Sequence, residues 1–193
     1  MTHGVRNKST TMGSAPLDLV DTVFDWEGAS VDRIDGPAAW RVWLVEAGLR
    51  QPATEIDDRQ LARMRDLRES IYAVATAMIA GLPAPEDAVV VVNEAATAPY
   101  PTAVLVVDER GLSARLPELG HDDVLTDIAR RTVDLFTAEH RSRLRACEDE
   151  GCPALFFDNS PAGDRRWCSP QCGARASSRE YRARRRAAAL VAV

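Results

Sequence analysis

The chain has 193 residues, of which 46% are hydrophobic, enough for the core of one or two globular domains. Residues 141–193 carry 11 arginines against 6 acidic residues, a balance of +5, whereas residues 1–140 carry 13 basic and 23 acidic residues, a balance of −10. The overall charge of −5 therefore hides a basic C-terminal part, the only part that would attract a polyanion. Residues 1–14 lack the apolar segment of a signal peptide, and no apolar run is long enough for a membrane span. We therefore expect a cytoplasmic protein with no membrane partner.

The first predicted element is a short helix that begins near Leu17. Its apolar residues alternate in a way that fits either a strand or a helix. We favour the helix, because Pro16 can open it and Leu17, Val20 and Phe24 then lie on one face. Residues 27–36 are expected to form a polar loop.

Two further helices are predicted from apolar residues at steps of three and four. The first is compact and runs from Gly36 to Ala47. The second is long and amphipathic, and it forms the spine of the first domain. Asp57 or Asp58 can cap its start, and Gly81 ends it.

The rest of the first domain is predicted as a helix, a hairpin and a helix. Residues 85–98 combine a β-branched run with a helix-starting Pro-Glu-Asp sequence, and we favour helix over strand. Residues 103–107 and 112–116 form a β-hairpin around a turn-forming sequence. A second long helix starts near residue 122 and runs to about Arg143. The expected fold class is therefore α+β, mainly helical with one small hairpin or sheet.

The four cysteines of the chain, Cys147, Cys152, Cys168 and Cys172, lie in one short stretch. They form a C-x4-C pair and a C-x3-C pair with 15 residues between them. This spacing is typical of four thiolates around one tetrahedral Zn²⁺ ion. Two disulfides are the alternative, and a reducing compartment disfavours them. Four protein ligands leave no open coordination position, so we expect one structural Zn²⁺ and no catalytic metal.

The residues between the cysteines predict a treble-clef zinc finger. Residues 154–157 read as one strand and 165–167 as the returning strand. Ser169 is a natural N-cap and Pro170 a natural first residue of the last helix, which would carry Cys172 in its first turn. The predicted organisation is a disordered tail, a helical domain, this finger and a short end: residues 1–14, 15–143, 144–187 and 188–193.

Arginines form a row on the helix that follows the last cysteine. Steps of four, three and four place several of them on one face, as contact with nucleic-acid phosphates requires. A nucleic acid, most simply duplex DNA, is therefore the expected partner. A protein module that docks an acidic partner is the alternative function, and a merely solvated face is the third possibility. The candidate residues are Arg175, Arg179, Arg182, Arg184, Arg185 and Arg186.

The stretch from Cys147 to Arg186 resembles the CGNR-type zinc finger. The matching motifs are Phe156-Phe157-Asp158, Arg165-Arg166-Trp167-Cys168-Ser169, Cys172-Gly173-Ala174-Arg175 and Tyr181-Arg182-Ala183-Arg184. Ala174 stands where that family has asparagine, so an amide that could bond to the hairpin or to a phosphate is missing. The resemblance implies a zinc-binding finger linked to a DNA-binding function.

Residues 15–140 resemble the ABATE-type domain that commonly precedes this finger. The matching segments are Leu17–Thr22, Trp43-Leu44, Leu67-Arg68-Glu69 and Asn93, with Asp21 where asparagine is usual. The resemblance implies a stress-responsive transcription regulator whose first domain binds a small, unidentified ligand. Association is the alternative role of this domain. The best polar candidates for that site are Asp18, Asp21, Thr22, Arg68 and Asn93. Because the three histidines lack catalytic spacing and no phosphate-binding glycine loop is present, we expect no enzymatic activity.

Overall fold

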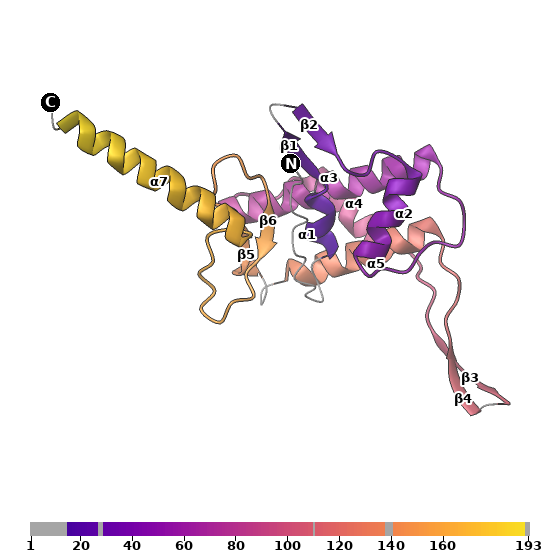
Figure 1. Cartoon of the computed structure of the whole chain (residues 1–193). Coiled ribbons are helices and arrows are strands. Elements are labelled where there is room, and N and C mark those ends of the chain that lie inside the picture. The colour runs from indigo at the N-terminus through magenta and orange to yellow at the C-terminus, as the bar shows by residue number, and fades with distance from the viewer. Residues whose placement is uncertain (1–14, 27–28, 110, 138–140, 192–193) are drawn as a thin grey trace.

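The computed structural model describes residues 15–26, 29–109, 111–137 and 141–191. The predicted disordered tail, residues 1–14, lies outside the described residues. Figure 1 shows a helical body with a β-hairpin projecting from one end and the last helix projecting from the other. None of the described helices is long and apolar enough to span a bilayer.

The first element is helix α1, Ala15–Val20, followed by an antiparallel hairpin of β1, Val23–Trp26, and β2, Ala29–Asp32. The prediction of a helix that includes Phe24 was therefore wrong, as was the polar loop at 27–36. The helix ends because the hydroxyl and the backbone N–H of Thr22 both donate to the carbonyl of Leu19. The β-branched Val23 then starts the strand.

The predicted helices of the body are present. They are α2, Pro37–Glu46, α3, Asp58–Ala80, and α4, Glu86–Thr97, with α5, His121–Leu135, packed against α1, α3 and α4. Asp57 caps α3 through a capping box with Gln60. Gly81 ends α3 in the left-handed region at φ 68°, which favours glycine. Trp40 and Ile71 are both fully buried in the common core.

Helix α5 ends at Leu135, earlier than the predicted end near Arg143. The hydroxyl of Thr137 bonds to the carbonyl of Asp134, and such local bonds compete with helix continuation. The chain then forms strand β5, Leu144–Ala146, in which Leu144 is buried. Burial of that leucine in the core accounts for a strand where helical periodicity was expected.

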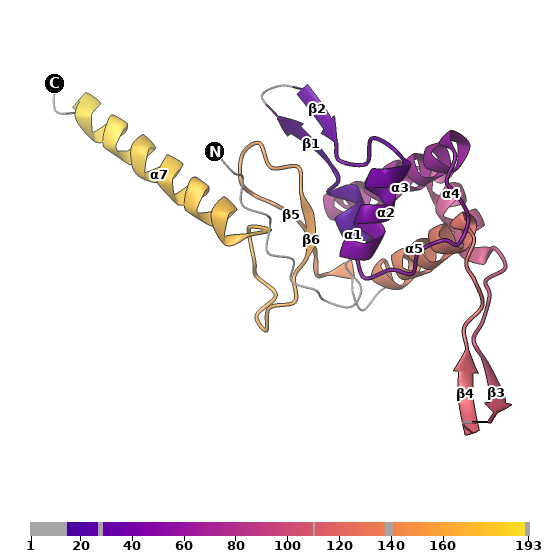
Figure 2. The same cartoon turned by 45° about the vertical axis from the view of Figure 1, so that its right-hand side comes forward.

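The predicted hairpin in the middle of the chain is present as β3, Val104–Asp108, and β4, Gly111–Arg115. Figures 1 and 2 show this ribbon standing away from the helices on two extended arms. Its two strands pair with each other in an antiparallel register.

The C-terminal finger consists of β5, β6, Leu155–Phe157, and α7, Pro170–Val191. Strand β6 pairs with β5, not with residues 165–167, so the predicted returning strand was wrong. The backbone N–H of Arg165 bonds instead to the carboxylate of Asp158. Helix α7 also continues to Val191, through most of the predicted 188–193 end.

The finger is packed directly on the first domain. Leu144 of β5 and Leu155 of β6 belong to the same buried cluster as Leu17 of α1 and Ile71 of α3. Helix α7 leaves this shared core and projects outward, as both views show. The two parts are therefore joined by a common core, while the helix with the arginines stays accessible.

Candidate metal centre and basic helix

The four cysteines converge from three parts of the finger. Cys147 follows β5, Cys152 lies in the loop before β6, Cys168 precedes α7, and Cys172 lies in its first turn. Their sulfur atoms all lie within 4.8 Å of one another. The Sγ–Sγ distances are 3.8 Å for Cys152–Cys168, 3.5 Å for Cys168–Cys172 and 3.8 Å for Cys172–Cys152. A tetrahedral zinc with bonds of about 2.3 Å requires sulfurs about 3.8 Å apart. The site fits one structural zinc.

Backbone and side-chain donors surround these sulfurs. The N–H of Cys168 donates to the sulfur of Cys147 at 3.4 Å, and the hydroxyl of Ser169 accepts from the N–H of Cys172 at 3.3 Å. Arg175 Nη2 donates to the sulfur of Cys172 at 3.0 Å. A zinc with four thiolates carries a formal charge of −2, and the donors from Cys168 and Arg175 that reach the sulfurs disperse it.

The thiols differ in acidity before metal binding. The side-chain hydrogen bond from Cys168 lowers the pKa of Cys152 to about 4. Burial raises the pKa of Cys147 above 9.0. Because all four sulfurs bind a metal as thiolates, zinc binding releases protons and depends on pH.

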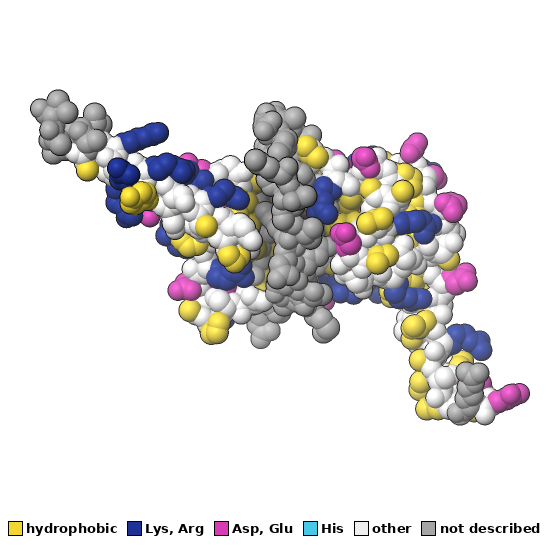
Figure 3. All heavy atoms as spheres, viewed as in Figure 1, with side chains coloured by type: hydrophobic (Ala, Val, Ile, Leu, Met, Phe, Trp, Pro, Cys, Tyr) yellow, Lys and Arg dark blue, Asp and Glu magenta, His cyan; other side chains and the backbone are white. Residues whose placement is uncertain are grey.

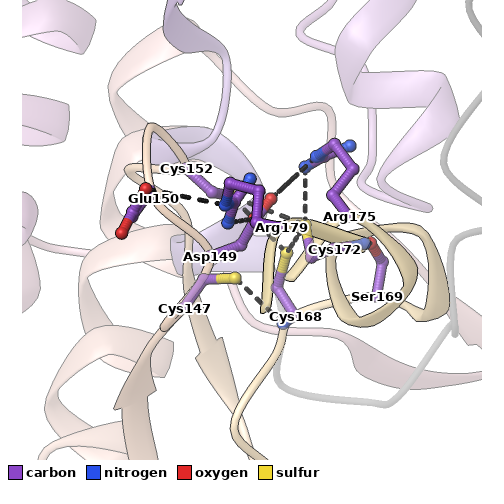
Figure 4. A network of polar contacts seen from close by, with 9 residues as sticks. All are labelled: Cys147, Asp149, Glu150, Cys152, Cys168, Ser169, Cys172, Arg175 and Arg179. Atoms are coloured by element: carbon purple, nitrogen blue, oxygen red, sulfur yellow. Dashed lines mark hydrogen bonds and ion pairs between the residues drawn. The ribbon is translucent and has the colours of Figure 1, made fainter. Parts of the chain in front are cut away.

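Asp149 lies at the centre of the polar network in Figure 4. Its side chain is 0% exposed and accepts hydrogen bonds from Arg175 Nε at 2.8 Å and from Arg179 Nη2. Burial alone would raise the pKa of Asp149, but the bonds from Arg179 and Arg175 outweigh it and lower the pKa below 3.8. The loop between β5 and β6, residues 147–154, is here called the zinc loop. Because Arg175 also bonds to Cys172, Asp149 connects the zinc loop to the first three turns of α7.

A second buried carboxylate, Asp158, fixes the loop between β6 and Cys168. Its oxygens accept from the N–H of Ser160 at 2.9 Å and from the N–H of Arg165 at 2.8 Å. Burial opposes ionisation, yet these bonds lower the pKa of Asp158. Arg143 adds a bond from Nη1 to the carbonyl of Ser160 at 2.6 Å.

The six arginines of α7 fall into two groups. Arg175 and Arg179 are paired with Asp149 and face the zinc loop. The other four are exposed and form no ion pair with a carboxylate of the described residues: Arg182, Arg184, Arg185 and Arg186. Figure 3 shows basic side chains gathered along this projecting helix. The helix therefore presents a free arginine surface, here defined as these last four residues.

The residues next to Cys172 pack the start of α7 against the finger. A Cβ atom on Gly173 would lie 3.2 Å from Cε3 of Trp167, so the indole lies tightly against this glycine. Arg166 lies over the Trp167 ring at 4.9 Å. Trp167 therefore has a packing role, and Ala174, in the position of the family asparagine, is exposed.

The predicted ligand residues are only partly brought together. Asp21 and Arg68 line a pocket of about 250 Å³. Thr22 is fully buried and accepts a bond from Arg68 Nη1 at 2.9 Å. Asp18 and Asn93 are not among the described residues that line this pocket.

Arg68 is an interior residue that is paired with Asp32. Its two Nη atoms reach the two oxygens of Asp32 at 2.8 and 2.7 Å. Burial opposes ionisation of Asp32, but the bonds from Arg68 prevail and lower its pKa. This bidentate pair ties α3 to the β1–β2 hairpin.

Sequence reasoning missed two residues, Asp32 and Asp149. Asp32 lay in a segment predicted to be a loop, and its partner Arg68 lies 36 positions away. Asp149 is separated from its partners by 26 and 30 positions. One signal for Asp149 was available in the sequence. An acidic residue lies between two zinc ligands, and the following helix carries two arginines four residues apart that could pair with it.

Comparison with known families identifies two matches. Residues 13–139 match the ABATE family, described as "Putative stress-induced transcription regulator". Residues 143–185 match the CGNR zinc finger. Neither description names an enzymatic activity. No curated protein matches the chain.

Proposed function

Since the chain belongs to the ABATE family, described as "Putative stress-induced transcription regulator", and carries a CGNR zinc finger at residues 143–185, we propose that it is a DNA-binding transcription regulator. The free arginine surface of α7 contacts the phosphates of duplex DNA, and the first domain senses a small ligand. The observation that carries this proposal is a projecting helix with four exposed arginines on an otherwise acidic chain.

The division of the arginines supports phosphate contact by the outer half of α7. Arg175 and Arg179 are held by Asp149, so their charges are already compensated. Arg182 and Arg186 lie one turn apart and continue the same helical face outward. Guanidinium groups suit phosphate oxygens because their donors form a planar fork. Such contacts position a protein on DNA without reading its sequence.

The zinc supports this function by fixing where α7 begins. Cys172 anchors its first turn to the metal, and Ser169 caps the same turn. The finger shares a core with the first domain through Leu144 and Leu155, and metal binding adds the free energy that fixes its loops and the start of α7. Removal of zinc is therefore expected to abolish DNA binding.

Fluorescence anisotropy with a labelled duplex tests the proposal. The double variant Arg182→Gln/Arg186→Gln is expected to bind about 10-fold or more weakly than the wild type at low salt. Arg115→Gln is the control, because it removes one positive charge from the β4 strand, away from α7. It is expected to bind DNA like the wild type. The proposal is wrong if the zinc-loaded protein does not bind DNA at low salt. Salt-sensitive binding to an acidic protein instead would favour the docking function.

The pocket beside Arg68 supports ligand sensing. Its described lining combines apolar Val20, Val23 and Tyr72 with Arg68, and it includes Pro153 of the zinc loop. Pro153 directly follows the zinc ligand Cys152. A molecule in this pocket would contact both the first domain and the finger. Its binding would therefore affect the zinc site and, through it, the start of α7.

A thermal-shift screen of small metabolites tests this second part. The comparison is between the wild type and Glu69→Trp, which narrows the pocket from an exposed position on α3. Compounds that stabilise the wild type but not the variant support a sensing site. If every stabilising compound acts equally on both proteins, the pocket is not the ligand site.

A further inference from the structure

The residues of the free arginine surface lie on different sides of α7. An α-helix turns by about 100° per residue, which places Arg182 and Arg186 about 40° apart on one side. Arg184 lies on the opposite side, about 180° from the mean direction of those two. A helix that rests on one strand of DNA needs a single row of basic residues. Basic residues on two opposite sides suit a helix that has phosphates on both sides of it.

Tyr181 and Arg185 lie between these two basic sides. They are one turn apart, in a direction about 80–100° from each basic side. Tyr181 is 55% exposed, and the guanidinium carbon of Arg185 lies over its ring at 6.0 Å from the centroid. This cation–π contact holds the guanidinium between the two basic sides. The side of α7 that carries these two residues is here called the reading side.

The side of α7 opposite the reading side has no residue that attracts DNA. It carries Ala183 and Ala187, about 180° and about 140° from the reading side. Glu180, the one acidic residue in the sequence of α7, lies about 120° from the reading side. The side chains of residues 180–188 are all exposed, so no described residue buries any side of this segment. The charges of the segment are therefore arranged around a definite direction of approach.

The shape of the outer half of α7 suits the major groove of DNA. Figures 1 and 2 show the helix projecting away from the helical body, so the body does not block access to it. The major groove of B-DNA is about 12 Å wide and admits an α-helix. An α-helix with its side chains is about 10–12 Å in diameter.

We propose that the outer half of α7 lies in the major groove and that Arg185 recognises a guanine. Arg182 and Arg186 then contact the phosphates of one strand, and Arg184 contacts those of the other strand. The reading side faces the base edges, where the Arg185 guanidinium donates two hydrogen bonds to O6 and N7 of guanine. Between the two rows of phosphates the charge of Arg185 still displaces counterions, so all four arginines contribute to the salt dependence. This inference rests on the proposed DNA binding and adds a sequence preference to it.

Selection of bound duplexes from a random-sequence library by the zinc-loaded full chain is the first test. The wild type is expected to enrich a guanine at a fixed position. Fluorescence anisotropy then compares the selected duplex with one that carries 7-deazaguanine there, a base that pairs normally but lacks the N7 acceptor. The replacement is expected to weaken wild-type binding about 5-fold or more and to leave the affinity of Arg185→Ala unchanged.

Arg184→Ala is the matched control, because it removes the same charge from a side assigned to phosphates. It is expected to weaken binding to both duplexes equally and to keep the ratio of the two affinities. Tyr181 acts as a positioning residue through Arg185. Tyr181→Ala should therefore lower this ratio, whereas Tyr181→Phe keeps the ring and should keep the ratio.

The possible results separate this inference from the proposed function. Absence of binding to any duplex at low salt would overturn both. Binding without a guanine preference, or a 7-deazaguanine effect that persists in Arg185→Ala, would overturn the base recognition and leave the phosphate contacts. A ratio that Arg184→Ala lowers as much as Arg185→Ala does would also overturn it. So would equal affinity for double-stranded RNA, because side chains cannot read its deep, narrow major groove.

Discussion

Replacing Asp149 with asparagine should weaken zinc binding, although Asp149 is not a metal ligand. The carboxylate is fully buried and forms ion pairs with Arg175 and Arg179. Arg175 also donates a hydrogen bond to the sulfur of Cys172. An amide is neutral and presents an NH₂ group to one of the guanidinium groups. Asp149→Asn therefore removes the charge that holds both arginines against the zinc loop.

The size of the effect follows from the exposure of the partners. Breaking a fully buried ion pair costs about 3–5 kcal/mol. The side chains of Arg175 and Arg179 are 55% and 32% exposed, so water can solvate part of the charge that loses its partner. We therefore expect a loss of about 2 kcal/mol, which corresponds to about 30-fold in affinity. The loss appears in zinc binding because the ordering of the loop that carries Asp149 and the binding of the metal are coupled.

Competition with a coloured zinc chelator at pH 7 measures this affinity. Glu150→Gln is the matched control, because Glu150 is 87% exposed and lies 3.6 Å from Arg179. The control is expected to change zinc affinity less than about 2-fold. The reasoning is refuted if Asp149→Asn retains wild-type affinity, or if Glu150→Gln costs as much.

Two further predictions concern the first domain. Arg68→Met leaves Asp32 without its bidentate partner and should lower the melting temperature by about 6–12 °C, for a loss of about 3 kcal/mol. Arg65→Met, whose guanidinium is 3.7 Å from Asp32, should cost less than about 1 kcal/mol; equal losses would contradict the assigned role of Arg68. Burial lowers the pKa of His121 below 6.5, so the unfolded chain takes up a proton there before the folded chain does. As the pH is lowered from about 6.5, the free energy of unfolding should therefore decrease, by up to about 1.4 kcal/mol per pH unit. His121→Phe should remove this pH dependence in urea melts. An unchanged pH dependence would assign it to other groups.

The sequence was most informative where local chemistry determines structure. The cysteine spacing predicted the metal centre, and helical periodicity with caps predicted α2 and α3, because these signals lie within a few residues of one another. The β1–β2 hairpin was missed because Asp32, at its end, is fixed by Arg68, far away in the chain. The pairing of β6 was missed for a related reason. Its partner strand precedes the zinc loop, in a segment whose local pattern continues a helix.

Non-local pairing also limited the prediction for the basic helix. From the sequence, all six arginines of α7 were candidates for phosphate contact, with Arg175, Arg179, Arg182 and Arg186 on one helical face. The fold separates them, because Asp149 of the zinc loop binds Arg175 and Arg179. No spacing rule connects an acid in the loop with arginines 26 and 30 residues later.

The central proposal is that the free arginine surface of zinc-loaded α7 contacts DNA phosphates. The salt dependence of binding to a duplex tests it most directly. Four phosphate contacts predict a slope of log K against log salt of about −3.6, and Arg182→Gln should reduce its magnitude by about 0.9. Arg115→Gln should leave the slope unchanged. A slope near zero, or one that Arg182→Gln does not alter, would contradict the account.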